Sequence, residues 1–385
     1  MTKKPSRKLI TKNKLITVII KINNKRQSLE VEMLDTVELC LTVTKANYEA
    51  LYTAIDCTIT EKNRMSSLSH KGKMLHCCKN QRWSYHTAAF YELGVLDLKL
   101  KKNNVNDYWK YWVVVKYKPA IALYSDDYAL TQNCDYERAV IKFKEFIDLI
   151  NKNIKEDQYA LKDLSFWVVR RIDFAVQFKT KFYREYLTLF KKNYSNLAED
   201  KHDSSFYIST KTANVNFYDK TIHLGKKDKE HVIRLEVQLK TKFLNNVYAE
   251  GLIEDKTLAA LWDGRLAKII LLKKIVKHIG LGDYMCFEQG LEKLKKSYTP
   301  KKVEKIMRVL QLSVHNRVLI GNIPSIMEVK SFGEIKAKYV KDKLFSALEK
   351  ANVNPVVIPA SWGIEKLQNP ISLIPEFKNN FEWMP

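Results

Sequence analysis

The sequence predicts an α+β fold in which an antiparallel sheet carries helices on one face. Apolar and polar residues alternate from Ile233 to Lys240, as in a strand with one buried face. The same alternation runs through residues 171–178. Residues 136–154 instead place apolar side chains three and four apart, which is typical of a helix that covers a sheet. With a further helix over 181–197, the order strand, helix, strand, strand indicates a ferredoxin-like or RNA-recognition-like domain.

Residues 203–240 are predicted to form a β-hairpin that carries the functional groups. Its first arm ends in the sequence V-N-F-Y-D-K, and its second arm is H-V-I-R-L-E-V-Q-L-K. Strand periodicity places four polar residues on the face opposite Val215 and Phe217. They are Asn214, Asn216, Tyr218 and Lys220. His223 and His231 flank the basic turn between the arms and are expected to be solvated.

The remaining segments are assigned by the same patterns. Strands are expected over 30–44, 96–100 and 109–117, a helix over 46–59, and a polar surface insertion over 64–85. Helices are expected over 258–279, 287–298, 301–312 and 331–350, the last opened by the capping box S-F-G-E. This tail fits a winged-helix or helix-turn-helix module, or a plain helical bundle. We therefore expect a basic N-terminal extension (1–29), a catalytic domain (30–245) and a C-terminal, mostly helical DNA-binding domain (246–385).

The charge of the chain indicates a polyanionic partner. Lys and Arg number 66 against 43 Asp and Glu, which leaves a net charge of +23. No run of roughly 18 apolar residues is present, so nucleic acid is favoured over a membrane. The N-terminus lacks the features of a secretory signal, and the six cysteines show no paired spacing. We expect reduced thiols and a cytoplasmic location.

Two strands offer the same pairing of an arginine with a carboxylate two residues later. Arg171 precedes Asp173, and Arg234 precedes Glu236. If the strands are neighbours, the two carboxylates can converge on a divalent cation such as Mg²⁺ or Mn²⁺, which hard oxygen ligands suit. The arginines could then hold phosphate. The alternative is that both are cross-strand ion pairs without a catalytic role.

Several motifs in order resemble those of a known family. They are W-V-V-R-R-I-D-F-A-V-Q-F (167–178), N-V-N-F-Y-D-K (214–220), V-I-R-L-E-V-Q-L-K (232–240), N-V-N-P-V-V-I-P-A-S-W-G-I (352–364) and M-L-D-T-V (33–37). Together they resemble the rolling-circle replication initiators of Firmicutes plasmids and filamentous-type phages. This group includes the gene II/X-like replication proteins and, more distantly, the Rep-trans initiators and conjugative relaxases.

The resemblance implies an HUH-like, metal-dependent endonuclease with a Rep-like sheet. In such enzymes a tyrosine attacks a phosphodiester at the origin, becomes linked to the 5′ phosphate and leaves a 3′ hydroxyl for a polymerase. Tyr218 matches the nucleophile, while Asp173 and Glu236 match the carboxylates. Lys220 would be catalytic together with Tyr218 and would also help to hold phosphate. The other phosphate-binding residues would be Arg171, Arg234, Asn216 and Lys240. Origin DNA, a host helicase, a polymerase and a possible homodimer partner are implied.

One departure from the family's pattern and three alternatives bear on this interpretation. The family's His-apolar-His metal motif is missing from the eight histidines, so the metal would rest on carboxylates. A phenol, with a pKa of about 10, needs a cation or metal to become a good nucleophile. Tyr207, in the same arm, is the rival nucleophile. The protein could instead be a conjugative relaxase, or a non-catalytic DNA- or RNA-binding protein.

Overall fold

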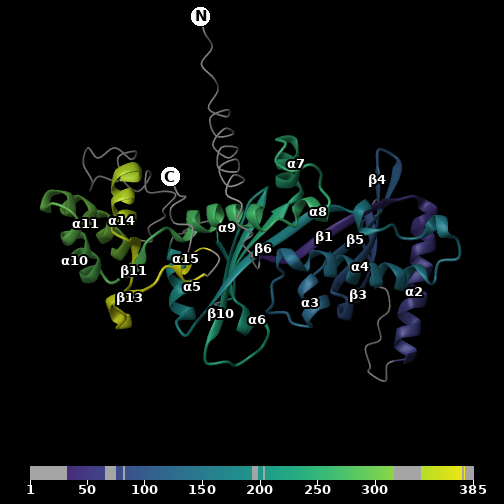
Figure 1. The fold of residues 1–385 in the computed structure, drawn as a ribbon, viewed down its shortest axis with the longest axis horizontal. Helices are drawn as coiled ribbons and strands as arrows, with labels where there is room; N and C mark the ends of the chain where they lie inside the picture. Colours follow the sequence, from purple (N-terminus) through teal and green to yellow (C-terminus); the bar gives the residue numbers. More distant parts are fainter. Residues whose placement is uncertain are drawn as a thin grey trace, which may run out of the picture. The chain divides into compact units, whose positions relative to one another are not determined.

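The computed structural model describes residues 33–65, 75–80, 83–192, 198–202, 204–315, 340–374 and 377. It is an α+β structure with a large antiparallel β component and many helices (Figure 1). The chain divides into two compact units. The first holds the described residues up to Phe174 together with Leu239–Lys268, and the second holds Ala175–Gln238 and the described residues from Ile269 onward. Among the helices described, none is long and apolar enough to cross a membrane.

The first unit is built on a sheet with the strand order β2-β3-β4-β5-β1-β6. The registered pairs in it are antiparallel. Its strands are β1 (Leu34–Val43), β2 (Leu75–Asn80), β3 (Trp83–Phe90), β4 (Val95–Val105), β5 (Tyr108–Tyr117) and the start of β6 (Val168–Thr180). Its helices are α2 (Lys45–Met65), α3 (Pro119–Tyr124), α4 (Tyr136–Asn151), α7 (Thr241–Ala249) and α8 (Leu258–Leu261).

Helices α2 and α4 pack on the same face of this sheet. Tyr48 of α2 lies with its ring centroid 5.2 Å from that of Tyr111, and Phe143 of α4 lies 5.1 Å from Tyr117. Tyr111 and Tyr117 are an even number of residues apart on β5, so they point to one side. The prediction of helices on one face therefore holds for these two helices. Trp112 and Lys116 lie at odd spacing between them on β5 and therefore point to the other face.

The second unit contains a sheet with the strand order β6-β10-β9-β8-β7. Its strands are the end of β6, β7 (Ala198–His202), β8 (Ser205–Ser209), β9 (Ala213–Asp219) and most of β10 (His231–Lys240). Phe217 of β9 packs against Phe190 of α5 (Tyr183–Lys192) at 5.5 Å and against His278 of α9 (Gly264–Ile279) at 6.3 Å. These two helices cover the apolar face of β9, which leaves Tyr218 on the opposite face.

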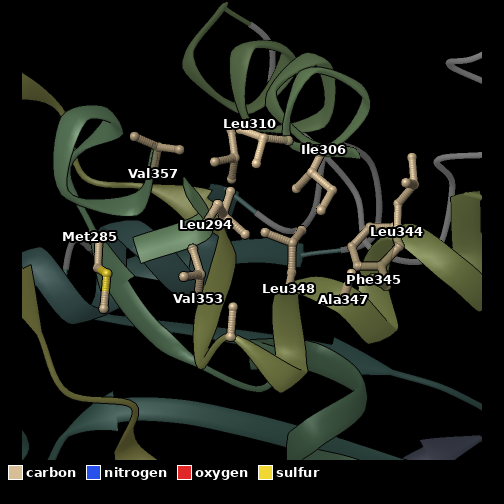
Figure 2. Packing of buried hydrophobic residues seen from close by; sticks show 12 residues of the cluster. Met285, Leu294, Ile306, Leu310, Leu344, Phe345, Ala347, Leu348, Val353 and Val357 are labelled. Atoms are coloured by element: carbon tan, nitrogen blue, oxygen red, sulfur yellow. The ribbon is translucent and has the colours of Figure 1, made fainter. Parts of the chain in front are cut away.

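A three-stranded sheet and several helices form a second core in this unit (Figure 2). The strand order is β12-β11-β13. The elements are β11 (Asp283–Met285), α10 (Phe287–Ser297), α11 (Pro300–His315), the π-helix η5 (Val340–Phe345), α14 (Ser346–Lys350), β12 (Val353–Val357), β13 (Lys366–Leu367) and α15 (Pro370–Leu373). The buried centre includes Leu294, Ile306, Leu310, Leu348 and Val353. Because the side chains come from three helices and a strand, this core fixes the C-terminal elements together.

Three predicted elements differ from the structure. The first arm of the predicted hairpin is two strands, β8 and β9, because the chain turns at Thr210–Thr212. The predicted surface insertion over 64–85 instead includes β2 and the start of β3. The predicted helix over 258–279 is interrupted between Leu261 and Gly264, giving α8 and α9. The N-terminal extension and the capping box at 331–334 lie outside the described residues, and the winged-helix module stays a prediction.

Candidate active site

The polar face of β9 presents the predicted nucleophile. Val215 and Phe217 are buried, whereas Asn214, Asn216 and Tyr218 between them are half-buried. This alternation is the one predicted from the sequence, and it results from the strand period of two residues. The neighbouring strand β10 contributes Glu236 to the same site.

Glu236 is the centre of a hydrogen-bond network. The Tyr218 hydroxyl donates to Oε2 at 3.0 Å, while Nδ2 of Asn216 donates to Oε1 at 3.2 Å. Nε2 of Gln238 also donates to Oε1, at 2.6 Å. The carboxylate is buried, and each of its oxygens has a polar partner. The phenol proton therefore points at a group that can accept it.

The network continues along the two strands away from Tyr218. Nδ2 of Asn214 donates to Oε1 of Gln238 at 3.1 Å, and Oγ of Ser209 donates to Oδ1 of Asn214 at 2.8 Å. These contacts join β8, β9 and β10 through their side chains. The side-chain amides of Asn214 and Gln238 each form hydrogen bonds through both their oxygen and their nitrogen. The orientation of Glu236 is therefore fixed before any substrate binds.

Lys220 does not extend the strand face, contrary to the prediction. The strand ends at Asp219, and Lys220 is the first residue of the short helix α6 (Lys220–His223), where it is buried. The Asp219 carboxylate causes this change, because it accepts hydrogen bonds from the backbone N–H groups of Thr221 at 2.9 Å and Ile222 at 3.1 Å. Such a cap stabilises a helix start directly after Asp219.

His231 was predicted to be solvated, but it is largely buried beside this cap. Its Nδ1 pairs with Oδ2 of Asp219, and its ring stacks on Tyr183 with the centroids 3.8 Å apart. His223 is exposed as predicted, yet its ring also meets the Tyr218 ring edge-on at 5.6 Å. Both histidines therefore support the backbone and ring around Tyr218.

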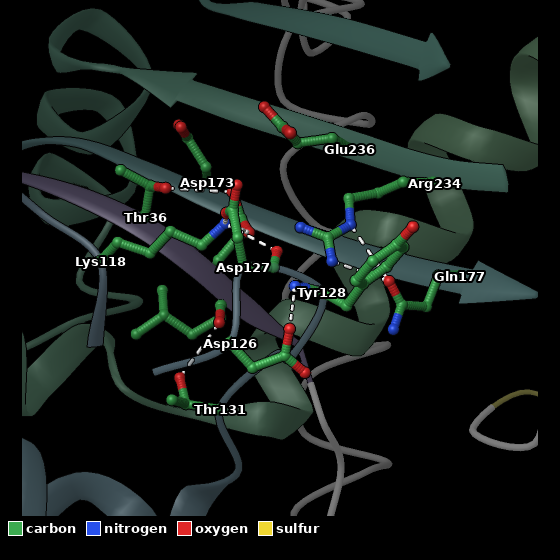
Figure 3. Close-up of polar contacts among 12 residues, drawn as sticks. Thr36, Lys118, Asp126, Asp127, Tyr128, Thr131, Asp173, Gln177, Arg234 and Glu236 are labelled. Atoms are coloured by element: carbon green, nitrogen blue, oxygen red, sulfur yellow. Dashed lines mark hydrogen bonds and ion pairs between the residues drawn. The ribbon is translucent and has the colours of Figure 1, made fainter. Parts of the chain in front are cut away.

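Arg234 lies fully buried on the same face of β10 as Glu236 (Figure 3). Its guanidinium donates to Oε1 of Gln177 through Nε at 3.2 Å and through a terminal nitrogen at 2.8 Å. The role of Arg234 in phosphate binding stays a prediction.

In the first unit, Arg171 and Asp173 form a close ion pair. Nε of Arg171 lies 2.8 and 3.1 Å from the two oxygens of Asp173, and a terminal nitrogen lies 2.5 Å from Oδ2. Asp173 is buried, and both of its oxygens are engaged by the guanidinium. This geometry is the paired state that the sequence left open as an alternative to a metal site. Lys240, the last residue of β10, is half-buried in this unit.

A buried cluster around Lys118 was not predicted (Figure 3). Nζ of Lys118 lies 3.1 Å from Oδ1 of Asp35, pairs with the carboxylate of Asp127, and donates to the Asp127 carbonyl at 3.1 Å. Asp35 belongs to the M-L-D-T-V motif, and Lys118 stands just before Pro119. The available signal was that Asp35 and Lys118 each stand at a buried strand. Because the two residues are far apart in the sequence, their pairing could not be predicted from it.

The described residues hold no cluster of three or more His, Cys, Asp or Glu side chains that could bind a metal ion. The predicted ligands Asp173 and Glu236 supply one carboxylate from each unit. The metal site predicted on these two carboxylates stays a prediction.

No protein-family model matches the chain, and no curated protein matches it. Among solved structures, the chain is similar to a rolling circle replication initiator protein from Geobacillus stearothermophilus. The match is 14% identical, covers 57% of this chain and 79% of the other, and has a TM-score of 0.26. A likeness at this TM-score carries no weight for the site, which rests on its own residues.

Proposed function

We propose that the protein is a rolling-circle replication initiator that nicks and rejoins one DNA strand at an origin. The observation that carries this proposal is the 3.0 Å hydrogen bond from the Tyr218 hydroxyl to Glu236. A phenol is a weak nucleophile near neutral pH, and a positioned carboxylate can take its proton as the new bond forms. The net charge of +23 supports a polyanionic substrate.

In the proposed step, Oη of Tyr218 attacks the phosphorus of one phosphodiester. The bond from Oη to phosphorus forms while the bond from phosphorus to the 3′ oxygen breaks. The phenol proton passes to Glu236, and the departing 3′ oxygen takes a proton from water. The products are a 5′-phosphotyrosine and a free 3′ hydroxyl. In rejoining, a 3′ hydroxyl attacks the phosphotyrosine and gives its proton to the solvent, which supplied one in the first step. The bond from phosphorus to Oη breaks, and Glu236 returns the proton to Tyr218.

Asn216 and Lys240, which are half-buried, would contact the phosphates. The phosphate-binding roles of Arg171, Arg234 and Lys220 stay predictions, because Arg171 pairs with Asp173 and the other two side chains are buried. A Mg²⁺ or Mn²⁺ ion held by Asp173 and Glu236 would polarise the phosphate oxygens when bound. The proposed partners are origin DNA, a host helicase, a polymerase and a second copy of the chain. The proposed initiator would be of the gene II/X-like kind, more distantly related to the Rep-trans initiators. A conjugative relaxase would use the same chemistry.

A second candidate is a DNA-binding protein without catalysis. The ion pair between Arg171 and Asp173 favours it, because a carboxylate already engaged by a guanidinium needs no metal. In this case the Tyr218–Glu236 contact would be structural. The two candidates differ in one product, the covalent adduct.

The test uses the full chain and a random-sequence pool of single-stranded oligonucleotides with Mg²⁺ or Mn²⁺. A label at the 3′ end marks the DNA that stays on the protein, and a label at the 5′ end marks the released fragment. We expect a denaturation-resistant adduct carrying only the 3′ label. Tyr218→Phe should abolish it, and Tyr207→Phe should retain it.

Tyr207 is a matched control, because it lies opposite Asn216 on the neighbouring strand and so on the same face. An adduct that survives in Tyr218→Phe and disappears in Tyr207→Phe would show that Tyr207, and not Tyr218, is the nucleophile. If the wild-type protein binds the pool and forms no adduct with either metal, the non-catalytic candidate is correct.

A further inference from the structure

The face of the first unit's sheet opposite α2 and α4 carries aromatic and basic side chains. On β5 it presents Tyr108, Lys110 and Trp112, which alternate with the residues that face the helices. On β4 and β3, residues in register with Trp112 extend it, because Lys101 pairs with Trp112 and Tyr85 pairs with Lys101. We call the residues Tyr85, Lys99, Lys101, Tyr108, Lys110 and Trp112 the aromatic–basic face.

Contacts of α2 confirm that this face points away from that helix. Tyr52 of α2 packs edge-on against His86 at 4.7 Å, and His86 is the neighbour of Tyr85 on β3. Consecutive residues of a strand point to opposite sides. Tyr85 and the residues in register with it therefore lie on the side that α2 does not cover. Tyr108, at the tip of the β4–β5 hairpin, is 77% exposed, and Lys110 is also exposed.

Cations lie over the aromatic rings of this face. The guanidinium of Arg170 lies 5.5 Å from the centre of the Trp112 ring, and Nζ of Lys99 lies 5.6 Å from the centre of the Tyr85 ring. The row Tyr85, Lys101, Trp112 thus crosses three strands as ring, ammonium, ring. Neighbouring strands are about 4.8 Å apart, so the two rings stand about 10 Å from each other.

Positive charge predominates among the side chains on this side of the sheet. Asp97 is bonded to Lys99 and to Thr87 at 2.5 Å, which offsets one ammonium. Glu38 lies opposite Lys116 in the register, which offsets another. Lys110, Lys101 and Arg170 add further positive charge. Burial lowers the pKa of Lys101 and the nearby Glu38 carboxylate raises it, so a phosphate beside Lys101 would favour its charged form.

We propose that the aromatic–basic face binds single-stranded DNA. Aromatic rings and a guanidinium plane offer stacking surfaces to unpaired bases, and the lysines offer charge to the phosphates between them. Bases in a duplex are already stacked on each other and cannot use these rings, so a single strand fits better. The face lies in the first unit and does not involve Tyr218. The choice of DNA over RNA rests on the proposed function.

The test is fluorescence anisotropy with labelled oligo-dT and the full chain at low salt. The double variant Tyr108→Ala/Lys110→Ala changes two exposed side chains at the edge of the face. We expect it to weaken binding at least about fivefold, the lower end of what loss of one stacked base produces. The matched control, Tyr91→Ala/Lys155→Ala, removes an exposed tyrosine and an exposed lysine elsewhere and should bind as the wild type does.

A second measurement does not depend on any variant. Oligonucleotides carrying 5-iododeoxyuridine crosslink to adjacent aromatic residues under ultraviolet light, and mass spectrometry should place the crosslinks on Tyr108, Trp112 or Tyr85. The proposal is wrong if the wild type does not bind oligo-dT, or if the double variant binds as tightly as the wild type or no more weakly than the control. It is also wrong if duplex DNA competes as well as a single strand, or if the crosslinks lie elsewhere.

These outcomes separate the face from the chemistry. If the wild-type protein binds oligo-dT as expected but forms no covalent adduct, the result counts against the proposed function alone. Unchanged affinity in Tyr108→Ala/Lys110→Ala, with adduct formed normally, would count against the face alone. Tighter binding of oligo-U than of oligo-dT would overturn the assignment of DNA as the ligand.

Discussion

The phenol oxygen of Tyr218 lies 3.0 Å from Oε2 of Glu236 and donates a hydrogen bond to it. The two side chains come from neighbouring strands, and Asn216 and Gln238 hold the other carboxylate oxygen. A tyrosine held against an oriented carboxylate has both the proton acceptor and the fixed position that a nucleophile needs. The proposal rests on this pair more than on either residue alone.

Replacing Glu236 by Gln should slow the chemical step and leave DNA binding nearly intact. Glutamine keeps the shape and can still bond to Tyr218, but it is a far weaker proton acceptor. General-base contributions are about 10²- to 10⁴-fold, and we expect a loss of adduct rate in that range. Single-turnover rates with labelled oligonucleotide measure it. Glu230→Gln, an exposed site with the same change in charge, should react normally; equal rates in both variants would contradict the role of Glu236.

Removal of divalent metal should abolish adduct formation, and Mn²⁺ should restore it. The protein's own Mn²⁺ binding is measured by the electron paramagnetic resonance signal of the free ion, in the absence of DNA. Asp173→Asn should weaken this binding, because it removes one of the two proposed carboxylate ligands. Asp107→Asn, in an exposed turn, is the control. Full activity in the presence of a strong chelator would show that the reaction needs no metal.

The sequence predicts those elements whose pattern is set by local periodicity. The strands around Ile172 and Leu235 and the helix α4 follow from apolar spacing alone, and the structure confirms them. The gap between the predicted strands over 96–100 and 109–117 holds the turn between β4 and β5, where Asn106 and Asp107 have φ values of 52° and 65°. These are the left-handed values of a tight hairpin turn, which Asn and Asp tolerate.

The parts that were missed depend on side-chain contacts that strand periodicity does not show. Lys220 appeared to continue a strand face, but the Asp219 side chain caps a helix there and ends the strand. His231 appeared to be part of a solvated turn, but Tyr183 and Asp219 bury it. Neither partner is visible from local periodicity. The side of the strand on which Tyr218 lies could be predicted, whereas its hydrogen bond to Glu236 could not.

Lys118→Met should strongly destabilise the first unit. The Lys118 ammonium balances the buried Asp35 carboxylate and also pairs with Asp127, so its loss leaves a buried charge uncompensated. Breaking a buried pair in this way costs about 3–5 kcal/mol of unfolding free energy. Lys144→Met removes an exposed pair with Asp148 and should cost less than about 1 kcal/mol. Urea unfolding followed by circular dichroism compares them; similar midpoints would show that the Lys118 cluster is not stabilising.

His278 should make the second unit less stable as the pH falls. Burial lowers its pKa from 6.5 to about 4, so below pH 6.5 the unfolded chain binds a proton that the folded chain does not. Stability therefore decreases from pH 6.5 downward and levels off near pH 4, a loss of about 2 kcal/mol by about pH 5. Urea midpoints at about pH 7 and about pH 5 measure this difference. It should shrink in His278→Leu and persist in His223→Leu, where the histidine is exposed; an unchanged difference in His278→Leu would exclude His278 as its source.

The most direct test of the account is to identify the residue that carries the DNA. The adduct formed with 3′-labelled oligonucleotide is digested with nuclease and protease, and the nucleotide-bearing peptide is sequenced by mass spectrometry. The account predicts a 5′-phosphate linked to Oη of Tyr218 in the peptide that spans β9. A phosphonucleotide on Tyr207 or any other residue, or a 3′ linkage, would contradict it.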